Sequence, residues 1–542
     1  MNKSTTNAGL PARENWSTKI GVILAVAGSA VGLGNFLRFP GVVAQNGGGA
    51  FMIPYFLSFL LLGIPVCWAE WIMGRRAGRL SGLSSSPGLF GILTHGSPFR
   101  YMGALGLFVP VVIYMYYVYV ESWCLAYAWY SITGALNLQD THLDNPYQIF
   151  FSEFTGQEIR PDGPHFFPSI LSTYIFFLIT FITNFYFIYR GLSKGIEFFC
   201  RWAMPMLVLM AFIVVIRVIT LGTPNPALPE QNVINGLGYM WNPDWEKLWN
   251  AEVWVNACGQ IFFSLSVGFG IIITYASYLK KDDDVVLSGL TASSANEFCE
   301  VCLGGLMVIP AAFVFLGMTQ MESVANAGTF SLGFVVMPHI FDLMPGGMFF
   351  SACFYFLLFL AGITSSLSML QPAIAFFEEG FGMNRKASVT ILSLITFFGA
   401  NAIIHSEGLT AMDTVDNYAS NLGIPLLALF EVCVFVFILK PAVGMQEAMI
   451  GSDMKIPKIF GFVITYITPI FLLAILGGWV KDQIVYYFFS PDWEPMNPIQ
   501  SRAILLMVMF LILLAILQTL AWPRMRRYAK EYQKTLHPDD LI

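Results

Sequence analysis

The chain has 542 residues, of which 56% are hydrophobic and only 11% are charged. Soluble globular proteins carry about 25% charged residues, so this chain has too few charges to cover a soluble globule. The composition excludes a soluble enzyme, a nucleic-acid-binding protein and a disordered chain. The net charge of −6 is small for this length and indicates no particular partner.

Apolar runs between polar breaks predict an all-α polytopic membrane protein with about twelve transmembrane helices of about 20 or more residues each. The expected spans are 17–44, 49–78, 98–134, 168–189, 194–220, 251–277, 285–318, 346–380, 384–406, 409–438, 455–481 and 498–522. Alternation across the membrane then places the three long connections, 135–167, 221–250 and 319–345, on one side.

The basic residues indicate how the chain is oriented. Most of the 28 Lys and Arg residues lie on the side opposite the long connections, so both termini are expected in the cytoplasm. Connection 135–167 has no cysteine and no N-glycosylation sequon, which favours a bacterial inner membrane over a eukaryotic cell surface. The basic tail, 523–542, is expected to lie against lipid headgroups.

The first and sixth spans are interrupted by pairs of glycines, Gly32 with Gly34 and Gly268 with Gly270. Glycine weakens a helix by about 1 kcal/mol relative to alanine, so each pair favours a local break, although close helix packing through small residues is the alternative. Breaks in spans one and six predict two inverted five-helix repeats, spans 1–5 and 6–10, around a central binding site. The corresponding division is a segment 1–16, a first repeat 17–220, a linker 221–250, a second repeat 251–438, two further helices in 439–522 and the tail 523–542.

A helix break exposes amide groups that suit a carboxylate and carbonyl groups that suit a cation. Side-chain oxygens near the predicted breaks come from Asn35, Ser264, Asn296, Thr364 and Ser365. Such hard oxygen ligands suit Na⁺, while hydrogen bonding between helices is the alternative use of the polar patch in span eight. The break of span one contains no fixed anion, which favours a substrate that brings its own carboxylate, such as a zwitterionic amino acid.

Two long motifs resemble the neurotransmitter:sodium symporter family. The run from Asn35 to Pro40, followed by the run from Asn46 to Phe51, resembles the family's signature in span one. The residues from Gln260 to Ser266 and from Tyr275 to Tyr278 resemble its sixth span. The resemblance covers roughly residues 13 to 522 and is to the bacterial amino-acid branch.

The resemblance implies two Na⁺ sites and a substrate site. The first Na⁺ site would use the Ala30 carbonyl, Asn35, Ser264, Asn296 and the substrate carboxylate, and the second Gly28, Val31, Ala361, Thr364 and Ser365. The substrate site would comprise Ala30, Leu33, Gly34, Ile113, Tyr117, Phe263, Ser264, Ser266, Phe269, Ser366 and Met369. Monoamine members have an aspartate where this chain has Gly32, and Ile113 narrows the pocket, so we expect a small or medium apolar amino acid.

The resemblance also implies gates and a substitute for chloride. Arg38 and Asp416 would close the outer gate, and Arg13, Trp16, Tyr278 and Glu379 the inner gate, where the neighbouring Glu378 is an alternative acid. Glu300, one helical turn after Asn296, would supply the charge that chloride supplies in other members, with proton counter-transport as an open option. Glu70 and Glu121 are expected to be structural hydrogen-bonding groups.

These expectations describe a chloride-independent, sodium-coupled symporter that imports neutral amino acids by alternating access. The alternatives are a proton-coupled permease of the same architecture, which would lack the oxygen ligands, and an ion channel. No nucleophile–base pair or set of metal ligands supports an intramembrane enzyme. A small-molecule substrate and the lipid bilayer are the expected partners, no nucleic acid is expected, and the oligomeric state is left open.

Overall fold

The computed structural model describes residues 16, 18–139, 141, 143–157, 167, 170–326, 329–406, 408–489 and 496–537. In this part of the chain the regular structure is entirely helical. The first half contains α1 (Lys19–Ala30), α2 (Phe39–Gln45), α3 (Gly49–Ser58), α4 (Ile64–Ser81), α5 (Ser86–Leu93), α6 (Met102–Thr133), α7 (Pro146–Thr155), α8 (Ile170–Tyr189), α9 (Phe198–Ile219), α10 (Val233–Trp241), α11 (Ala251–Leu265) and α12 (Ile271–Ser277). The second half contains α13 (Val285–Glu297), α14 (Leu306–Asn326), α15 (Thr329–Ser331), α16 (Met337–Leu343), α17 (Gly347–Met369), α18 (Gln371–Phe381), α19 (Arg385–Ile404), α20 (Thr410–Asp416), α21 (Ile424–Cys433), α22 (Pro441–Ala448), α23 (Ile459–Phe462), α24 (Thr468–Phe489) and α25 (Pro498–Gln533).

Nine helical stretches of the described residues are long and apolar enough to cross a membrane, and a bent pair in span one makes ten. The other two predicted spans, 168–189 and 251–277, correspond to α8 and to the broken pair α11 and α12. Helix α8 spans 20 residues, and the pair α11 and α12 is interrupted between Leu265 and Ile271. A helix therefore lies at each predicted span, and the fold is that of a polytopic all-α membrane protein.

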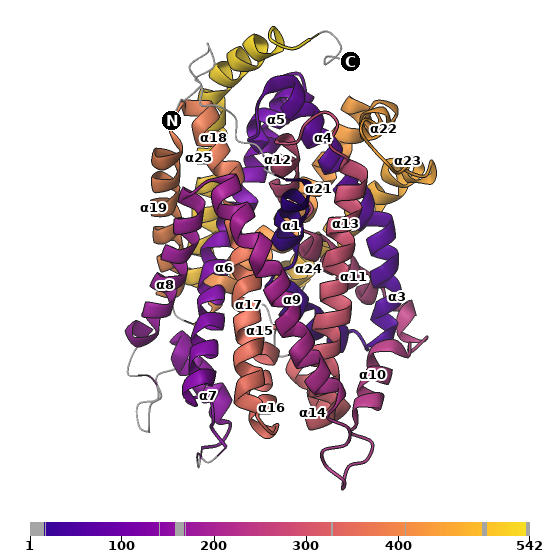
Figure 1. Cartoon of the computed structure of the whole chain (residues 1–542), viewed down its shortest axis with the longest axis vertical. Coiled ribbons are helices and arrows are strands. Elements are labelled where there is room, and N and C mark those ends of the chain that lie inside the picture. Colours follow the sequence, from indigo (N-terminus) through magenta and orange to yellow (C-terminus); the bar gives the residue numbers. More distant parts are fainter. Residues whose placement is uncertain are drawn as a thin grey trace.

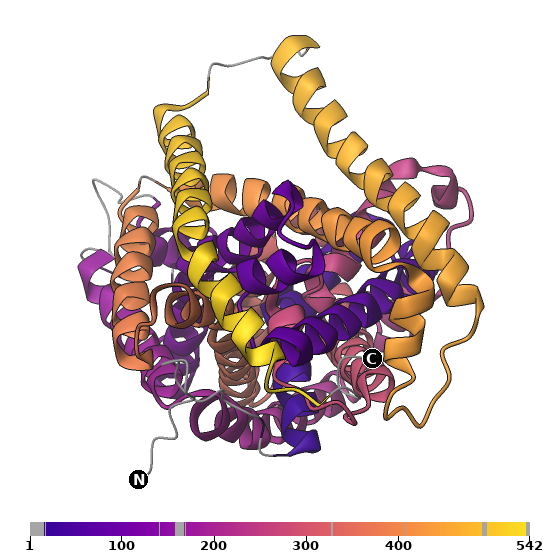
Figure 2. The same cartoon turned by 90° about the horizontal axis from the view of Figure 1, so that it is seen from above.

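The long axes of the main helices run roughly together, and α1 lies near the middle of the bundle (Figure 1). The short helices α7, α10 and α16, which belong to the three long connections, lie at one end, while α5 and α22 lie at the other. Seen from above, α24 lies at the edge of the bundle, and α25 runs from the edge across the near face of the bundle (Figure 2).

Span one breaks where its glycines predict. Helix α1 ends at Ala30, Val31 is extended, and a π-helical turn over Gly34–Arg38 leads into α2, with a bend of 46° across the break. The carbonyls at the end of α1 and the amides after it are thereby exposed to other ligands.

Span six breaks in the same way between α11 and α12. The backbone φ angles are +55° at Ser266 and +74° at both Gly268 and Gly270. Glycine adopts this left-handed region without steric cost, which explains both glycines in the break. A Cβ on Gly270 would lie 2.7 Å from the Gly106 carbonyl oxygen, so the break also packs tightly against α6.

The two broken spans are held by close helix contacts. A Cβ on Gly304 would lie 2.1 Å from the Asn35 carbonyl oxygen, so span seven packs directly on the span-one break. On α4, Cβ atoms on Gly74 and Gly78 would lie 2.3 and 2.4 Å from backbone oxygens of α12. Small residues therefore seat the broken segments against their neighbours, as is common in membrane bundles.

Candidate functional site

A buried cluster of polar side chains surrounds the break of span one. Asn35 Nδ2 donates to Asn296 Oδ1 at 2.9 Å and to Glu300 Oε2 at 3.1 Å. Asn296 Nδ2 donates to Ser264 Oγ at 2.7 Å, and the Ser264 hydroxyl donates to Glu300. Gln260 Nε2 donates to the other Glu300 oxygen at 2.7 Å. We call these five residues, from spans one, six and seven, the Glu300 cluster; their side chains are almost completely buried.

The cluster orients the open backbone of span one. Asn35 Oδ1 accepts the Gly32 amide at 2.8 Å, and the Tyr117 hydroxyl oxygen accepts the Leu33 amide at 3.0 Å. A Cβ on Gly32 would lie 2.7 Å from both Ser365 Oγ and Tyr117 Oη. A side chain at position 32 would therefore displace the Ser365 or Tyr117 hydroxyl.

A second set of oxygens lies between the end of α1 and α17. Ser365 Oγ donates to the Gly28 carbonyl at 3.3 Å and to the Val31 carbonyl at 3.5 Å. Thr364 Oγ1 donates to the Ala361 carbonyl at 3.0 Å. The residues predicted to form the second Na⁺ site are therefore connected by hydrogen bonds, one within α17 and two between Ser365 and the end of α1.

A small cavity of about 20 Å³ lies between the two oxygen sets. It is lined by Ser29, Ala30, Gly32, Gly34, Asn35, Ile113, Tyr117, Phe263, Ser264, Ser266, Phe269, Ser365 and Met369. Among the described residues, no charged side chain contributes to this lining. Two predicted substrate residues lie elsewhere: Leu33 faces the next cavity outward, and the Ser366 hydroxyl donates to Asn184 Oδ1 at 2.6 Å.

Above this cavity lies an outer cavity of about 80 Å³ that Arg38, Asp416, Tyr116 and Phe263 help to line. The Arg38 guanidinium lies 4.4 Å from the centre of the Phe263 ring. Asp416 instead accepts hydrogen bonds from Tyr116 Oη at 2.5 Å and Ser420 Oγ at 2.6 Å. No ion pair between Arg38 and Asp416 occurs in the described part of the chain. These two residues, predicted to form the outer gate, therefore line the same cavity without contacting each other as an ion pair.

The residues predicted to form the inner gate are packed differently. Trp16 stacks edge-on to Tyr275 with ring centres 5.1 Å apart, and its indole donates to the Tyr275 carbonyl at 3.2 Å. Tyr278 Oη accepts from Gln371 at 2.9 Å. Glu379 accepts the Ser84 amide at 2.6 Å and the Ser85 hydroxyl at 2.5 Å, beside the start of α5. Arg13 lies outside the described residues.

Other buried acids also make hydrogen bonds near the breaks. Glu70 Oε1 accepts the Gly268 amide at 2.7 Å, and Glu121 Oε1 accepts from Asn184 at 2.8 Å. Glu297, which the sequence pattern alone does not single out, accepts from Tyr55 Oη at 2.7 Å beside the Glu300 cluster. Its place next to Asn296, three residues before Glu300, is the signal that could have identified it.

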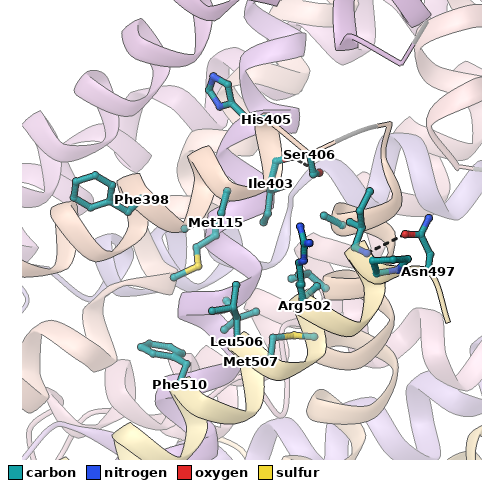
Figure 3. A pocket seen from close by; sticks show the side chains of 18 residues that line it. Met115, Phe398, Ile403, His405, Ser406, Asn497, Arg502, Leu506, Met507 and Phe510 are labelled. Carbon is teal, nitrogen blue, oxygen red and sulfur yellow. Dashed lines mark hydrogen bonds between the residues drawn. The ribbon is translucent and has the colours of Figure 1, made fainter.

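The largest of the cavities described lies away from these groups. Figure 3 shows this space of about 950 Å³, lined mainly by apolar side chains of α6, α19, α20 and α25, with Arg502 and His405 among them. None of the predicted site residues that the structure describes lines it. Size alone therefore does not select the candidate site, which the sequence predicts at the broken helices and converging oxygens.

Comparison with known proteins places these features in a family. The model of the sodium:neurotransmitter symporter family matches residues 13–150 and 169–522. A sodium-dependent transporter of Methanocaldococcus jannaschii is 28% identical over 86% of this chain and 90% of its own length. The sodium-dependent serotonin transporter of Drosophila melanogaster is 29% identical over 89% of this chain and 79% of its own.

A solved structure shares the fold. The crystal structure of MhsT in complex with L-phenylalanine superposes with a TM-score of 0.72 at 29% sequence identity, over 86% of this chain and all of that one. This likeness extends to the inverted-repeat architecture predicted from the two broken spans. The family match over most of the chain, together with the helical bundle and its broken spans, shows that the chain belongs to the sodium:neurotransmitter symporter family and is a multi-pass secondary transporter, not an enzyme.

Proposed function

We propose that this chain is a sodium-coupled symporter that imports neutral, small or medium apolar amino acids by alternating access. The observation that carries the proposal is the Glu300 cluster, in which a buried carboxylate and neutral oxygens meet at the break of span one. The family supports Na⁺ dependence, and the number of two ions rests on there being two oxygen sets.

The electrostatics of the cluster favour a bound cation. Among the described residues, the hydrogen-bond partners of Glu300 are neutral side chains, and Glu297 brings a second carboxyl group nearby. A buried charge without a counter-charge is costly within a membrane. We propose that Na⁺, held by the Ala30 carbonyl, Asn35, Ser264 and Asn296, offsets that cost. The substrate carboxylate would complete this first set.

The second Na⁺ would bind the Gly28, Val31 and Ala361 carbonyls with the Thr364 and Ser365 hydroxyls. Because these atoms come from α1 and α17, a cation bound among them would hold the two helices together. Release of this ion would then free the inner half of span one to move. That motion is the inward-opening step of the proposed cycle.

The residues around the small cavity suit an amino-acid substrate. The Leu33 and Gly34 amides and Tyr117 would receive the carboxylate, and the Ile113, Phe269 and Met369 side chains would contact an apolar side chain. Gly32 supplies no carboxylate that could pair with a monoamine, and a Cβ there would displace the Ser365 or Tyr117 hydroxyl. MhsT was crystallised with L-phenylalanine, which supports an amino acid here as well.

Glu300 would also remove the need for chloride, because it already places a negative charge beside the first Na⁺ set. We propose that the same carboxyl group takes up a proton when Na⁺ and substrate have left, and releases it when Na⁺ returns. Proton counter-transport would follow from this exchange.

A proton-coupled permease of the same architecture is the alternative, and it requires no Na⁺ for substrate binding. A thermal-unfolding screen of the purified chain against the twenty amino acids, in NaCl and in KCl, distinguishes the two. We expect a subset of neutral amino acids to raise the unfolding temperature in NaCl only. Equal stabilisation in KCl would favour the permease.

We also propose a bacterial inner-membrane location with both termini in the cytoplasm, based on the basic residues around α4, α22 and the end of α25. A fluorescent protein fused to the C-terminus should then fluoresce, and an alkaline phosphatase fused there should be inactive. The reverse result would overturn the orientation. We also propose the repeat boundaries 17–220 and 251–438, which follow from the order of the spans and the positions of the two broken ones.

A further inference from the structure

A cavity of about 470 Å³ lies at the end of the bundle occupied by α5 and α22, opposite the small substrate cavity's outer entrance. Its lining comes from α4, α5, the end of span ten, α22 and the last turns of α25. Its volume is within the range of about 300–1,000 Å³ that is typical of small-molecule sites. In the described part of the chain it shares no lining residue with the cavities around the broken spans.

The ionisable side chains in this lining are Arg76, His95, Arg526 and Lys530, and no acidic residue is among the described residues that line it. Arg526 and Lys530 are four residues apart on α25 and therefore share one face of the helix. Both are exposed, and neither forms an ion pair within the described part of the chain.

Arg76 does have an acidic partner, since its Nη1 lies 3.1 Å from Glu447 Oε2. The same carboxylate is shared with Arg75 at 3.2 Å and Arg79 at 2.9 Å. Three guanidinium groups therefore share the Glu447 carboxylate, and of these Arg76 lines the cavity.

The floor of the cavity is apolar. Ile92, Ile438, Leu439 and Trp522 line it, and Trp522 lies one helical turn before Arg526 on α25. Tryptophan is enriched at the boundary between hydrocarbon and headgroups. Large exposed apolar side chains on α25, such as Leu520, precede this point, and the charged residues follow it. The cavity thus spans the level at which an acyl chain meets a phosphate.

We propose that this cavity binds an anionic phospholipid of the leaflet at that end, with its phosphate between Arg76, Arg526 and Lys530 and its proximal acyl carbons against Trp522 and Leu439. A neutral lipid would leave the cationic groups without a counter-charge, and a free anion would leave the apolar floor exposed. The bound lipid joins peripheral helix α25 to α4 and α22, and so stabilises the end of the bundle beside the inner gate.

The test uses the full-length chain in a neutral detergent, with lipid binding measured by native mass spectrometry and by thermal unfolding. The probes are phosphatidylglycerol, phosphatidylcholine with the same acyl chains, and glycerol phosphate as a soluble headgroup. Each Lys or Arg near an anionic surface contributes roughly a fivefold gain in affinity. The double variant Arg526→Gln/Lys530→Gln should therefore bind phosphatidylglycerol about 25-fold more weakly, without a change in its weaker binding of phosphatidylcholine.

The matched control is Arg527→Gln, which removes an exposed charge from the same part of α25 but does not alter the cavity lining. It should bind phosphatidylglycerol within about twofold of the unaltered chain, because it removes no group that faces the cavity. Unchanged unfolding of both variants without lipid shows that they are folded; if the double variant unfolds early, Lys530→Gln alone should show the fivefold loss. Unchanged phosphatidylglycerol binding by the cavity variants, or equal stabilisation by glycerol phosphate, would overturn the proposal.

Discussion

Glu300 lies completely buried, and its hydrogen-bond donors among the described residues are all neutral. Hydrogen bonds to a charged group contribute about 1.5–3 kcal/mol each, but they do not neutralise the carboxylate. At the scale of single residues, the proposed function therefore depends on which ion provides the compensating charge. Gly32 contributes no charge, and its lack of a side chain leaves space for the groups around the break.

Replacing Glu300 by serine should make transport depend on chloride. The serine hydroxyl would leave Asn35, Ser264 and Gln260 facing an anion-sized space, and an anion there would restore the missing charge. Uptake of the amino acid should fall at least tenfold in sodium gluconate and recover in sodium chloride. The ratio of the two rates is the readout, and Glu121→Gln, which alters a buried acid bonded to Asn184, should leave that ratio near one. An equal loss in both salts for Glu300→Ser would count against the chloride-substituting role.

Replacing Gly32 by alanine should weaken substrate binding by about tenfold or more. The new Cβ would lie 2.7 Å from Ser365 Oγ and Tyr117 Oη, and overpacking of this kind typically costs about 1–3 kcal/mol. Gly41→Ala in the same span is the matched control, because a Cβ at that position would have nothing within 4 Å of it. Binding measured by scintillation proximity should be unchanged in that control. Tight substrate binding by Gly32→Ala would show that the break is not part of the site.

At the scale of elements, the interrupted helices α1 and α11 are the features that bring distant residues together. The breaks could be predicted because Gly32, Gly34, Gly268 and Gly270 fall within otherwise apolar spans. The direction in which a serine hydroxyl points could not be predicted. Ser366, for example, donates to Asn184 and does not line the small cavity. Residue spacing gives a helical face, whereas the rotamer depends on partners from other helices.

The connections are harder to predict than the spans. The apolar pattern predicts a connection over 319–345, and α14 is kinked at Gly317 (φ +72°), close to that boundary. The helical segment that continues from the kink to Asn326, and α16 after it, are what the pattern does not predict. Glu379 likewise bonds to the start of α5, a contact between segments that are far apart in the sequence. Such contacts depend on tertiary packing, which one sequence without its relatives does not reveal.

In the break of span six, the Gly268 amide donates a hydrogen bond to Glu70. Glu70→Ala removes the acceptor and leaves a buried amide unsatisfied, which typically costs about 1–3 kcal/mol. Thermal unfolding in detergent should therefore begin at a lower temperature for Glu70→Ala. Glu70→Gln keeps a carbonyl oxygen for the amide and should recover most of the loss. If glutamine and alanine destabilise the protein equally, the hydrogen bond is not what supports the break.

At the scale of the whole molecule, the two ends of the site differ. Trp16 packs on Tyr275 at the proposed inner end, while Arg38 and Asp416 line a cavity of about 80 Å³ at the proposed outer end. This asymmetry fits the outward-facing half of an alternating-access cycle. Two Na⁺ ions moving down a tenfold gradient and 100 mV would release roughly 7 kcal/mol, enough for about a 10⁵-fold substrate gradient at full coupling.

The most direct test of sodium-coupled amino-acid import is uptake of a radiolabelled amino acid, chosen by the thermal screen, into proteoliposomes. With an inward Na⁺ gradient, the amino acid should accumulate above its external concentration, saturably, and should leak out when an ionophore collapses that gradient. Replacing Na⁺ with K⁺ should abolish accumulation. Equal uptake in K⁺, accumulation driven by a proton gradient alone, or a large unsaturable flux would contradict the proposed function.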